Sequence, residues 1–137
     1  MFSCHIVYLL MCIASIPVVS QELEDTEILT ELSMPKHLFK ILSLENWEAS
    51  QSAPKVILSS NDDQFVHFSK EDQLPRVISK YWSDSSGFVI LTIDTDKLLG
   101  EMLYETNPGG TAKYYHLYNG SIPSEAVVES QKICKDP

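Results

Sequence analysis

The stretch DQFVHFS, residues 63–69, decides how the rest of the chain is interpreted. Alternate side chains of an extended strand point to opposite faces of a sheet, so Phe65, His67 and Ser69 share one face. Val66 and Phe68 lie on the other face. Since both faces carry apolar groups, the stretch predicts a strand that is buried on both sides. A histidine and a hydroxyl at such positions need hydrogen-bond partners, from the protein or from a ligand.

The residues that follow predict a sharp turn into a helix. Ser69 begins the sequence Ser-Lys-Glu-Asp, which is typical of a capping box. Pro75 is tolerated only in a first turn, so the regular helix is expected from about Gln73, with an apolar face at helical spacing. Polar groups at the start of a helix indicate a site, because free N–H groups there attract anions.

The remaining segments place the chain in the α+β class, with a mixed or antiparallel sheet and a few short helices. A helix is expected over residues 44–50, capped by Ser43, and Asp94 is expected to cap one helical turn. Lys40 lies between apolar neighbours on the first strand, where its charge needs a partner. Asn119-Gly120 is expected to turn the chain. Strands are expected at residues 37–42, 88–93, 102–105, 114–118 and, last, from 127 to about 134, and a short strand or an extended edge is expected at 55–59.

The N-terminus differs from the rest of the chain. Residues 6–16 are apolar and uncharged, and small residues precede Gln21, which together predict a cleaved signal peptide over residues 1–20. A retained anchor and a cytosolic chain are the alternatives. An acidic, mobile lead-in is expected over 21–34 and a single domain over 35–137. The expected location is therefore secreted, without membrane attachment after cleavage.

Charge and cysteine content restrict the partners. The net charge of −9 argues against nucleic acid, which needs a basic surface. Signal cleavage leaves one cysteine, Cys134, which is buried, free or disulfide-linked to a partner chain. No cysteine–histidine pattern suggests a metal. Asn119-Gly120-Ser121 is an acceptor for an N-linked sugar in a secretory lumen.

A series of short motifs over about residues 36–130 resembles the domain-of-unknown-function 952 family in its order and spacing. This resemblance implies a compact domain with the ADP-ribosyltransferase fold, without an agreed activity. The motifs are Leu38-Phe39-Lys40-Ile41, Trp47, Phe65 to Ser69 with Gln73, Leu91-x-Ile93-Asp94, Tyr104-Glu105, His116-Leu117-Tyr118, Ile122-Pro123 and Ala126-Val127.

The wider resemblance to ADP-ribosyltransferases implies roles by order along the chain. Lys40 stands where the adenosine side of NAD is held, His67 where a ring stacks on nicotinamide, and His116 where a glutamate supports the ribosyl cation. Because an imidazole is a poor substitute for a carboxylate, Glu105 on a neighbouring strand is the alternative at the third position. The implied catalytic set is His67, His116 and Glu105, and the implied NAD-binding set is Lys40, His67, Ser69 and Tyr118.

These observations predict a secreted domain that binds NAD or a related nucleotide such as ADP-ribose. One alternative is a ligand-free extracellular interaction domain, and another is active ADP-ribosyl transfer or NAD hydrolysis. Two weaker hypotheses remain. His67 and His116 could bind a metal with Asp63, and Ser69, His116 and Asp94 could form a hydrolase triad, although no G-x-S-x-G sequence supports it.

Overall fold

The computed structural model describes residues 33–136, and the residues from Met34 onward belong to one unit of structure, Met34–Pro137. The predicted signal peptide and nearly all of the predicted acidic lead-in lie outside the described residues. Among the described residues, no helix has the length and apolar character that a membrane span requires.

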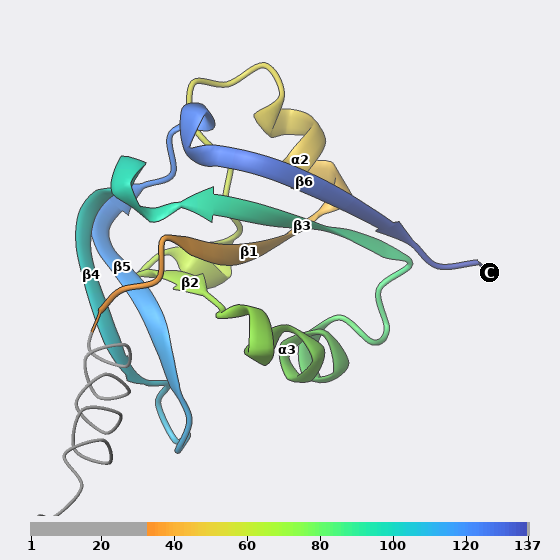
Figure 1. The fold of residues 1–137 in the computed structure, drawn as a ribbon. Coiled ribbons are helices and arrows are strands. Elements are labelled where there is room, and N and C mark those ends of the chain that lie inside the picture. The colour runs from red at the N-terminus through yellow and green to blue at the C-terminus, as the bar shows by residue number, and fades with distance from the viewer. Residues whose placement is uncertain (1–32, 137) are drawn as a thin grey trace, which may run out of the picture. The chain divides into compact units, whose positions relative to one another are not determined.

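The chain forms two three-stranded sheets whose pairings are all antiparallel, with strand orders β1-β3-β6 and β2-β5-β4 (Figure 1). This confirms the predicted α+β class with mostly antiparallel strands. The first sheet contains β1 (His37–Ser43), β3 (Gly87–Asp94) and β6 (Val127–Cys134), and the second contains β2 (Val66–Phe68), β5 (Lys113–Ser121) and β4 (Leu99–Thr106).

The two sheets are joined where β1 meets the end of β2. Phe39 and Ser69 form an isolated antiparallel bridge in which each backbone N–H donates to the other carbonyl at 2.9 Å. The hydrophobic core draws on both sheets, with Leu38, Leu91 and Ile93 from the first and Phe68 from the second, all nearly inaccessible. This bridge therefore fixes β2, and the histidine it carries, against β1.

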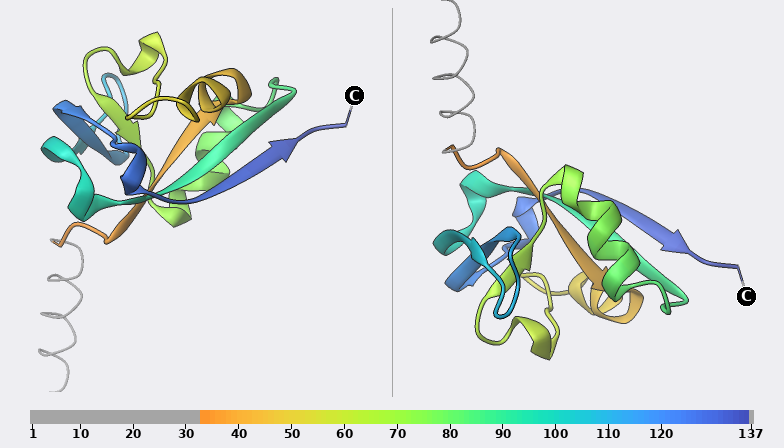
Figure 2. Two further views of the ribbon diagram at one scale, coloured as in Figure 1. Left: turned by 90° about the horizontal axis from the view of Figure 1, so that it is seen from above. Right: turned by 90° about the horizontal axis from the view of Figure 1, so that it is seen from below.

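Two α-helices and four short 3-10 turns connect the strands. Ser43 caps α2, since its hydroxyl accepts a hydrogen bond from the backbone N–H of Asn46 at 3.1 Å. Helix α3 lies across one face of β1 and β3 (Figure 2, right). The helices are α2 (Leu44–Ser50) and α3 (Leu74–Tyr81), and the turns are η1 (Ser60–Asp62), η2 (Glu71–Gln73), η3 (Thr95–Lys97) and η4 (Ser124–Ala126).

Three local predictions are wrong. Ser69 does not cap a helix, because its backbone pairs with Phe39 and the chain turns one residue later, where Gln73 Oε1 accepts the N–H of Lys70 at 2.9 Å. Of the two alternatives for residues 55–59, the strand is wrong, because the N–H of Ile57 donates to the Ser50 hydroxyl at 2.8 Å. The extended edge agrees with the isolated bridge between Lys55 and Pro123.

The third wrong prediction concerns Asn119-Gly120, which lies within β5 instead of ending it. Asn119 has φ 49°, Gly100 opposite has φ 126°, and the register of β4 and β5 shifts between Leu99 and Glu101. A Cβ added at Gly120 would lie 1.9 Å from the carbonyl oxygen of Leu99. The glycine thus permits a β-bulge with close backbone contact, which absorbs the positive φ angles without reversing the chain.

Candidate functional site

Two histidines face each other across neighbouring strands of the second sheet. His67 on β2 is directly opposite His116 on β5, and their ring centroids are 5.3 Å apart with an interplanar angle of 71°. Val66 and Phe68 point into the core, as the alternation of the strand predicts. The His67 side chain is 42% exposed, so this face of β2 is more open than the sequence indicates.

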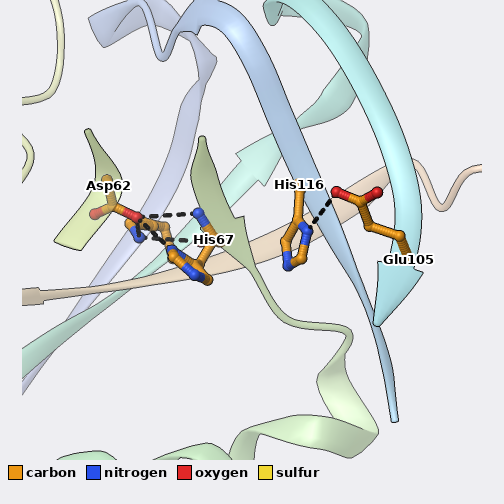
Figure 3. Close-up of polar contacts among 5 residues, drawn as sticks. Asp62, His67, Glu105 and His116 are labelled. Atoms are coloured by element: carbon orange, nitrogen blue, oxygen red, sulfur yellow. Dashed lines mark hydrogen bonds and ion pairs between the residues drawn. The ribbon is translucent and has the colours of Figure 1, made fainter. Parts of the chain in front are cut away.

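His67 is held by a buried ion pair. Asp62 Oδ1 accepts hydrogen bonds from the Lys40 ammonium at 2.8 Å and from the backbone N–H of His67 at 3.0 Å. The same oxygen lies 3.0 Å from His67 Nδ1, and Lys40 also donates to the His67 carbonyl at 3.0 Å. Figure 3 shows these contacts converging on Asp62. The side chains of Lys40 and Asp62 are only 6% and 5% exposed.

The electrostatics of this pair favour an ionised Asp62. Burial acts to raise the pKa of the Asp62 carboxyl, but the hydrogen bonds from His67 and the charge of Lys40 outweigh it, and the pKa is lowered. Burial lowers the pKa of the Lys40 ammonium against the opposing charge of Asp62. The ionised carboxylate favours the tautomer in which His67 Nδ1 donates to it, and in that tautomer Nε2 is an acceptor.

His116 is held by a second carboxylate. Glu105 Oε1 lies 2.9 Å from His116 Nδ1 and also accepts a hydrogen bond from the Tyr118 hydroxyl (Figure 3). The hydrogen bond from Tyr118, and then that from His116, lowers the pKa of the Glu105 carboxyl, while the same bond raises the pKa of the Tyr118 phenol. Glu105 is therefore an ionised carboxylate, and its side chain is 37% exposed.

An aromatic ring covers the second histidine. Phe65 stacks on His116 with a centroid distance of 4.1 Å and an interplanar angle of 28°. Its centroid is also 4.7 Å from that of His67 and 5.1 Å from that of Tyr118. We call Phe65, His67, His116 and Tyr118 the aromatic cluster. Each of its two imidazoles has one nitrogen fixed by a carboxylate, an arrangement that orients rings for binding or proton transfer.

The structure brings most of the sequence-predicted residues together. His67, His116, Tyr118 and Glu105 share one site, whereas Lys40 reaches it only through Asp62 and the His67 backbone. Ser69 is buried, and its backbone pairs with Phe39 at the sheet junction.

Sequence reasoning missed two contributors to the site. It named no partner for the buried charge of Lys40, although that charge required one, and Asp62 supplies it. It also placed Phe65 on the same face as His67 without identifying it as the cover of His116.

No contact among the described residues supports the hypothesis of a metal site or that of a hydrolase triad. The described residues contain no group of three potential metal ligands, and Asp63 does not join the histidines in one. Asp94 accepts the backbone N–H of Asp96 and lies 3.6 Å from Lys36, whereas the Nδ1 atom of His116 contacts Glu105. No hydrogen bond or ion pair among the described residues assembles Ser69, His116 and Asp94 into a triad.

We expect acid to destabilise the fold through Asp62. Because its folded-state pKa lies below the ordinary value of 3.8, ionised Asp62 stabilises the fold above that pH. That stabilisation is lost as the pH falls through the lowered pKa. Urea denaturation from about pH 6 to about pH 2 should therefore show the stability difference between the wild type and Asp62→Asn shrinking. A difference that stays constant would contradict the proposed ionisation.

Comparison with known proteins gives a family and a fold. Residues 41–130 match the family described as "Protein of unknown function (DUF952)". The crystal structure of protein CC0527 from Caulobacter crescentus is similar, with a TM-score of 0.63 and 25% identity over 73% of this chain and 88% of that one. Its solution NMR structure gives a TM-score of 0.61 and 22% identity over 74% and 88% of the two chains, which supports the fold alone. None of the curated proteins compared with the chain matches it. Because the family match covers most of the chain, this protein belongs to the DUF952 family of proteins of unknown function.

Proposed function

We propose that this protein is a secreted domain with an ADP-ribosyltransferase-like fold that binds NAD or a related ADP-ribose nucleotide at the aromatic cluster. The observation that carries the proposal is the gathering of four rings, two of which contact the ionised carboxylate of Glu105. Planar bases stack on aromatic and imidazole faces. Ribose hydroxyls are donors, and both the Glu105 carboxylate and the imidazole of the partly exposed His67 can accept hydrogen bonds.

Lys40 has an indirect part in this proposal. Its ammonium donates to Asp62 and to the His67 carbonyl, so its charge is neutralised inside the protein. We assign it the positioning of Asp62, and through Asp62 of the His67 ring, in place of a direct contact with phosphate. Ser69 likewise contributes by fixing the end of β2 against Phe39.

Glu105 favours a second candidate, NAD hydrolysis or ADP-ribosyl transfer. It is ionised, partly exposed and beside the stacked rings, where a cationic sugar would need a carboxylate. In hydrolysis, a water oxygen bonds to the anomeric carbon as the bond to nicotinamide breaks. The electron pair of that bond neutralises the pyridinium nitrogen, and the water gives a proton to His67 Nε2 or to solvent.

A ligand-free extracellular interaction domain is the contrasting function. Cys134, at the end of β6, is exposed and makes no disulfide within the described residues, so it is accessible to a partner's thiol. Asn119 is exposed and accessible to a sugar. Secretion itself rests on the sequence of residues 1–20, and a mature N-terminus at Gln21 in the culture medium would test it.

Thermal denaturation of the mature protein tests nucleotide binding. NAD or ADP-ribose should raise the melting temperature, because a ligand that binds only the native state stabilises it by about 2.7 kcal/mol at 100 times its Kd. His67→Ala should abolish the shift, whereas His37→Ala, which alters an exposed histidine at the start of β1, should retain it. A melting temperature that is unchanged at millimolar NAD and ADP-ribose would refute binding and leave the interaction domain.

A further inference from the structure

His116 contains a buried acceptor without a donor. The residue is 0% exposed, and its Nε2 atom has no hydrogen-bond partner among the described residues. Nδ1 lies 2.9 Å from Glu105 Oε1, and in the tautomer in which Nδ1 donates to this carboxylate Nε2 carries a lone pair. In Figure 3 this nitrogen lies on the side of the ring away from Glu105. Buried polar atoms in native proteins are almost always paired, so an unpaired one needs an explanation.

Phe65 is the residue whose ring covers one face of the His116 imidazole. Its ring lies flat against His116 at 4.1 Å, but Phe65 itself is only half-buried and precedes β2 instead of pairing within it. It is also absent from the buried hydrophobic core that joins the sheets. A half-buried ring on an irregular segment can move at much lower cost than a core side chain such as Phe68.

We propose that Phe65 occupies the place of a planar ligand ring, and that the ligand displaces it and donates a hydrogen bond to His116 Nε2. The ligand class follows from this geometry. The ligand needs an aromatic ring to stack on the imidazole, and it needs an N–H or O–H donor on a substituent that can turn out of the ring plane. A nicotinamide ring with its carboxamide satisfies both conditions. The inference rests on the proposed function and adds the residue that gates the site and the atom that selects the ligand.

Binding of a small aromatic ligand to a variant that lacks the Phe65 ring tests this proposal directly. We expect Phe65→Ala to bind free nicotinamide at least about tenfold more tightly than the wild type, because the ligand no longer has to displace a side chain. Methyl nicotinate has the same ring without an N–H donor, and it should bind at least about tenfold more weakly than nicotinamide. In protein labelled with ¹⁵N-histidine, nicotinamide should shift the Nε2 resonance of His116, which reports the new hydrogen bond.

Two further variants keep the test decisive. Tyr81→Ala removes an exposed ring on α3 outside the cluster and should gain no affinity for nicotinamide. Phe65→Leu, which keeps an apolar side chain, should fold and show an intermediate gain. An equal gain in Tyr81→Ala, no gain in either folded Phe65 variant, or equal binding of both probes would overturn the inference.

The outcomes also separate the inference from the proposed function. If the wild type fails to bind NAD while Phe65→Ala binds nicotinamide as expected, the proposed function is refuted, but the inferred ring-binding site occupied by Phe65 is supported. If the wild type binds NAD and neither Phe65 variant gains nicotinamide, binding stands and the gating role of Phe65 fails.

Discussion

Replacing Lys40 with methionine should lower the free energy of unfolding by about 3–5 kcal/mol, because the Asp62 carboxylate would remain buried without its cation. Methionine keeps the length and apolar stem of lysine, so the loss reports the charge more than the packing. Urea denaturation monitored by tryptophan fluorescence would measure it, since Trp47 packs against the core.

Lys36 supplies the matched control for this prediction. It forms ion pairs with Asp94 and Asp96 at 3.6 and 3.0 Å, but its side chain is 64% exposed. Lys36→Met should therefore change the free energy of unfolding far less than Lys40→Met does. If the two lysine variants lose the same stability, the buried pair has no special role. The double variant Lys40→Met/Asp62→Leu should lose less than the sum of its single variants, because contacting residues couple.

The same ion pair connects stability to the site. Asp62 Oδ1 accepts from Lys40 on β1 and from both the backbone and the ring of His67 on β2. Loss of Lys40 removes a charge that, after the hydrogen bond from His67, helps to lower the pKa of Asp62, and it removes the cation that holds this carboxylate beside His67 Nδ1. A buried lysine on β1 thus acts, through Asp62, on the orientation of a partly exposed ring on β2.

The sequence predicted the features that depend on neighbouring residues. The cap at Ser43, the helix over residues 44–50 and the turn at Asp94 each need only a side chain and a backbone N–H a few residues apart. His67 lies on the opposite face of β2 from Val66 and Phe68, and the two-residue period of a strand is enough to predict this. The burial of Lys40 could also be predicted from the sequence, because its apolar neighbours on the strand belong to the core.

What the sequence could not supply is register between distant strands. Glu105 reaches His116 because β4 pairs with β5 so that Leu103 faces His116 and Glu105 faces Tyr114. That pairing brings Glu105 within diagonal reach of the histidine, and a shift of one residue would turn the carboxylate to the other face. The bulge between Leu99 and Glu101 shifts this register, and the Asn119-Gly120 pattern was read as a turn. The covering ring of Phe65 escaped prediction for a similar reason, since stacking depends on the tertiary fold.

Glu105→Gln should lower the rate of nicotinamide release from NAD by about 10²–10³-fold, in line with the loss of one preorganised group at a developing charge. Glutamine keeps the size of the side chain and its hydrogen-bonding capacity, but it lacks the negative charge that a ribosyl cation needs. Mass spectrometry of released nicotinamide under saturating NAD would measure the rate. The variant should retain the NAD-induced rise in melting temperature, because stacking on the aromatic cluster does not require the charge.

Glu101 provides a control on the same strand. It is exposed, and it lies opposite Tyr118 in the register of β4 and β5, so Glu101→Gln removes a charge near the cluster without touching the Glu105 contacts. Its rate should stay within about twofold of the wild type, because exposed charges are screened by water and salt. An unchanged rate in Glu105→Gln would exclude that carboxylate from the chemistry. If the wild type binds NAD but releases no nicotinamide, the role of Glu105 is limited to orienting His116 and Tyr118 for binding.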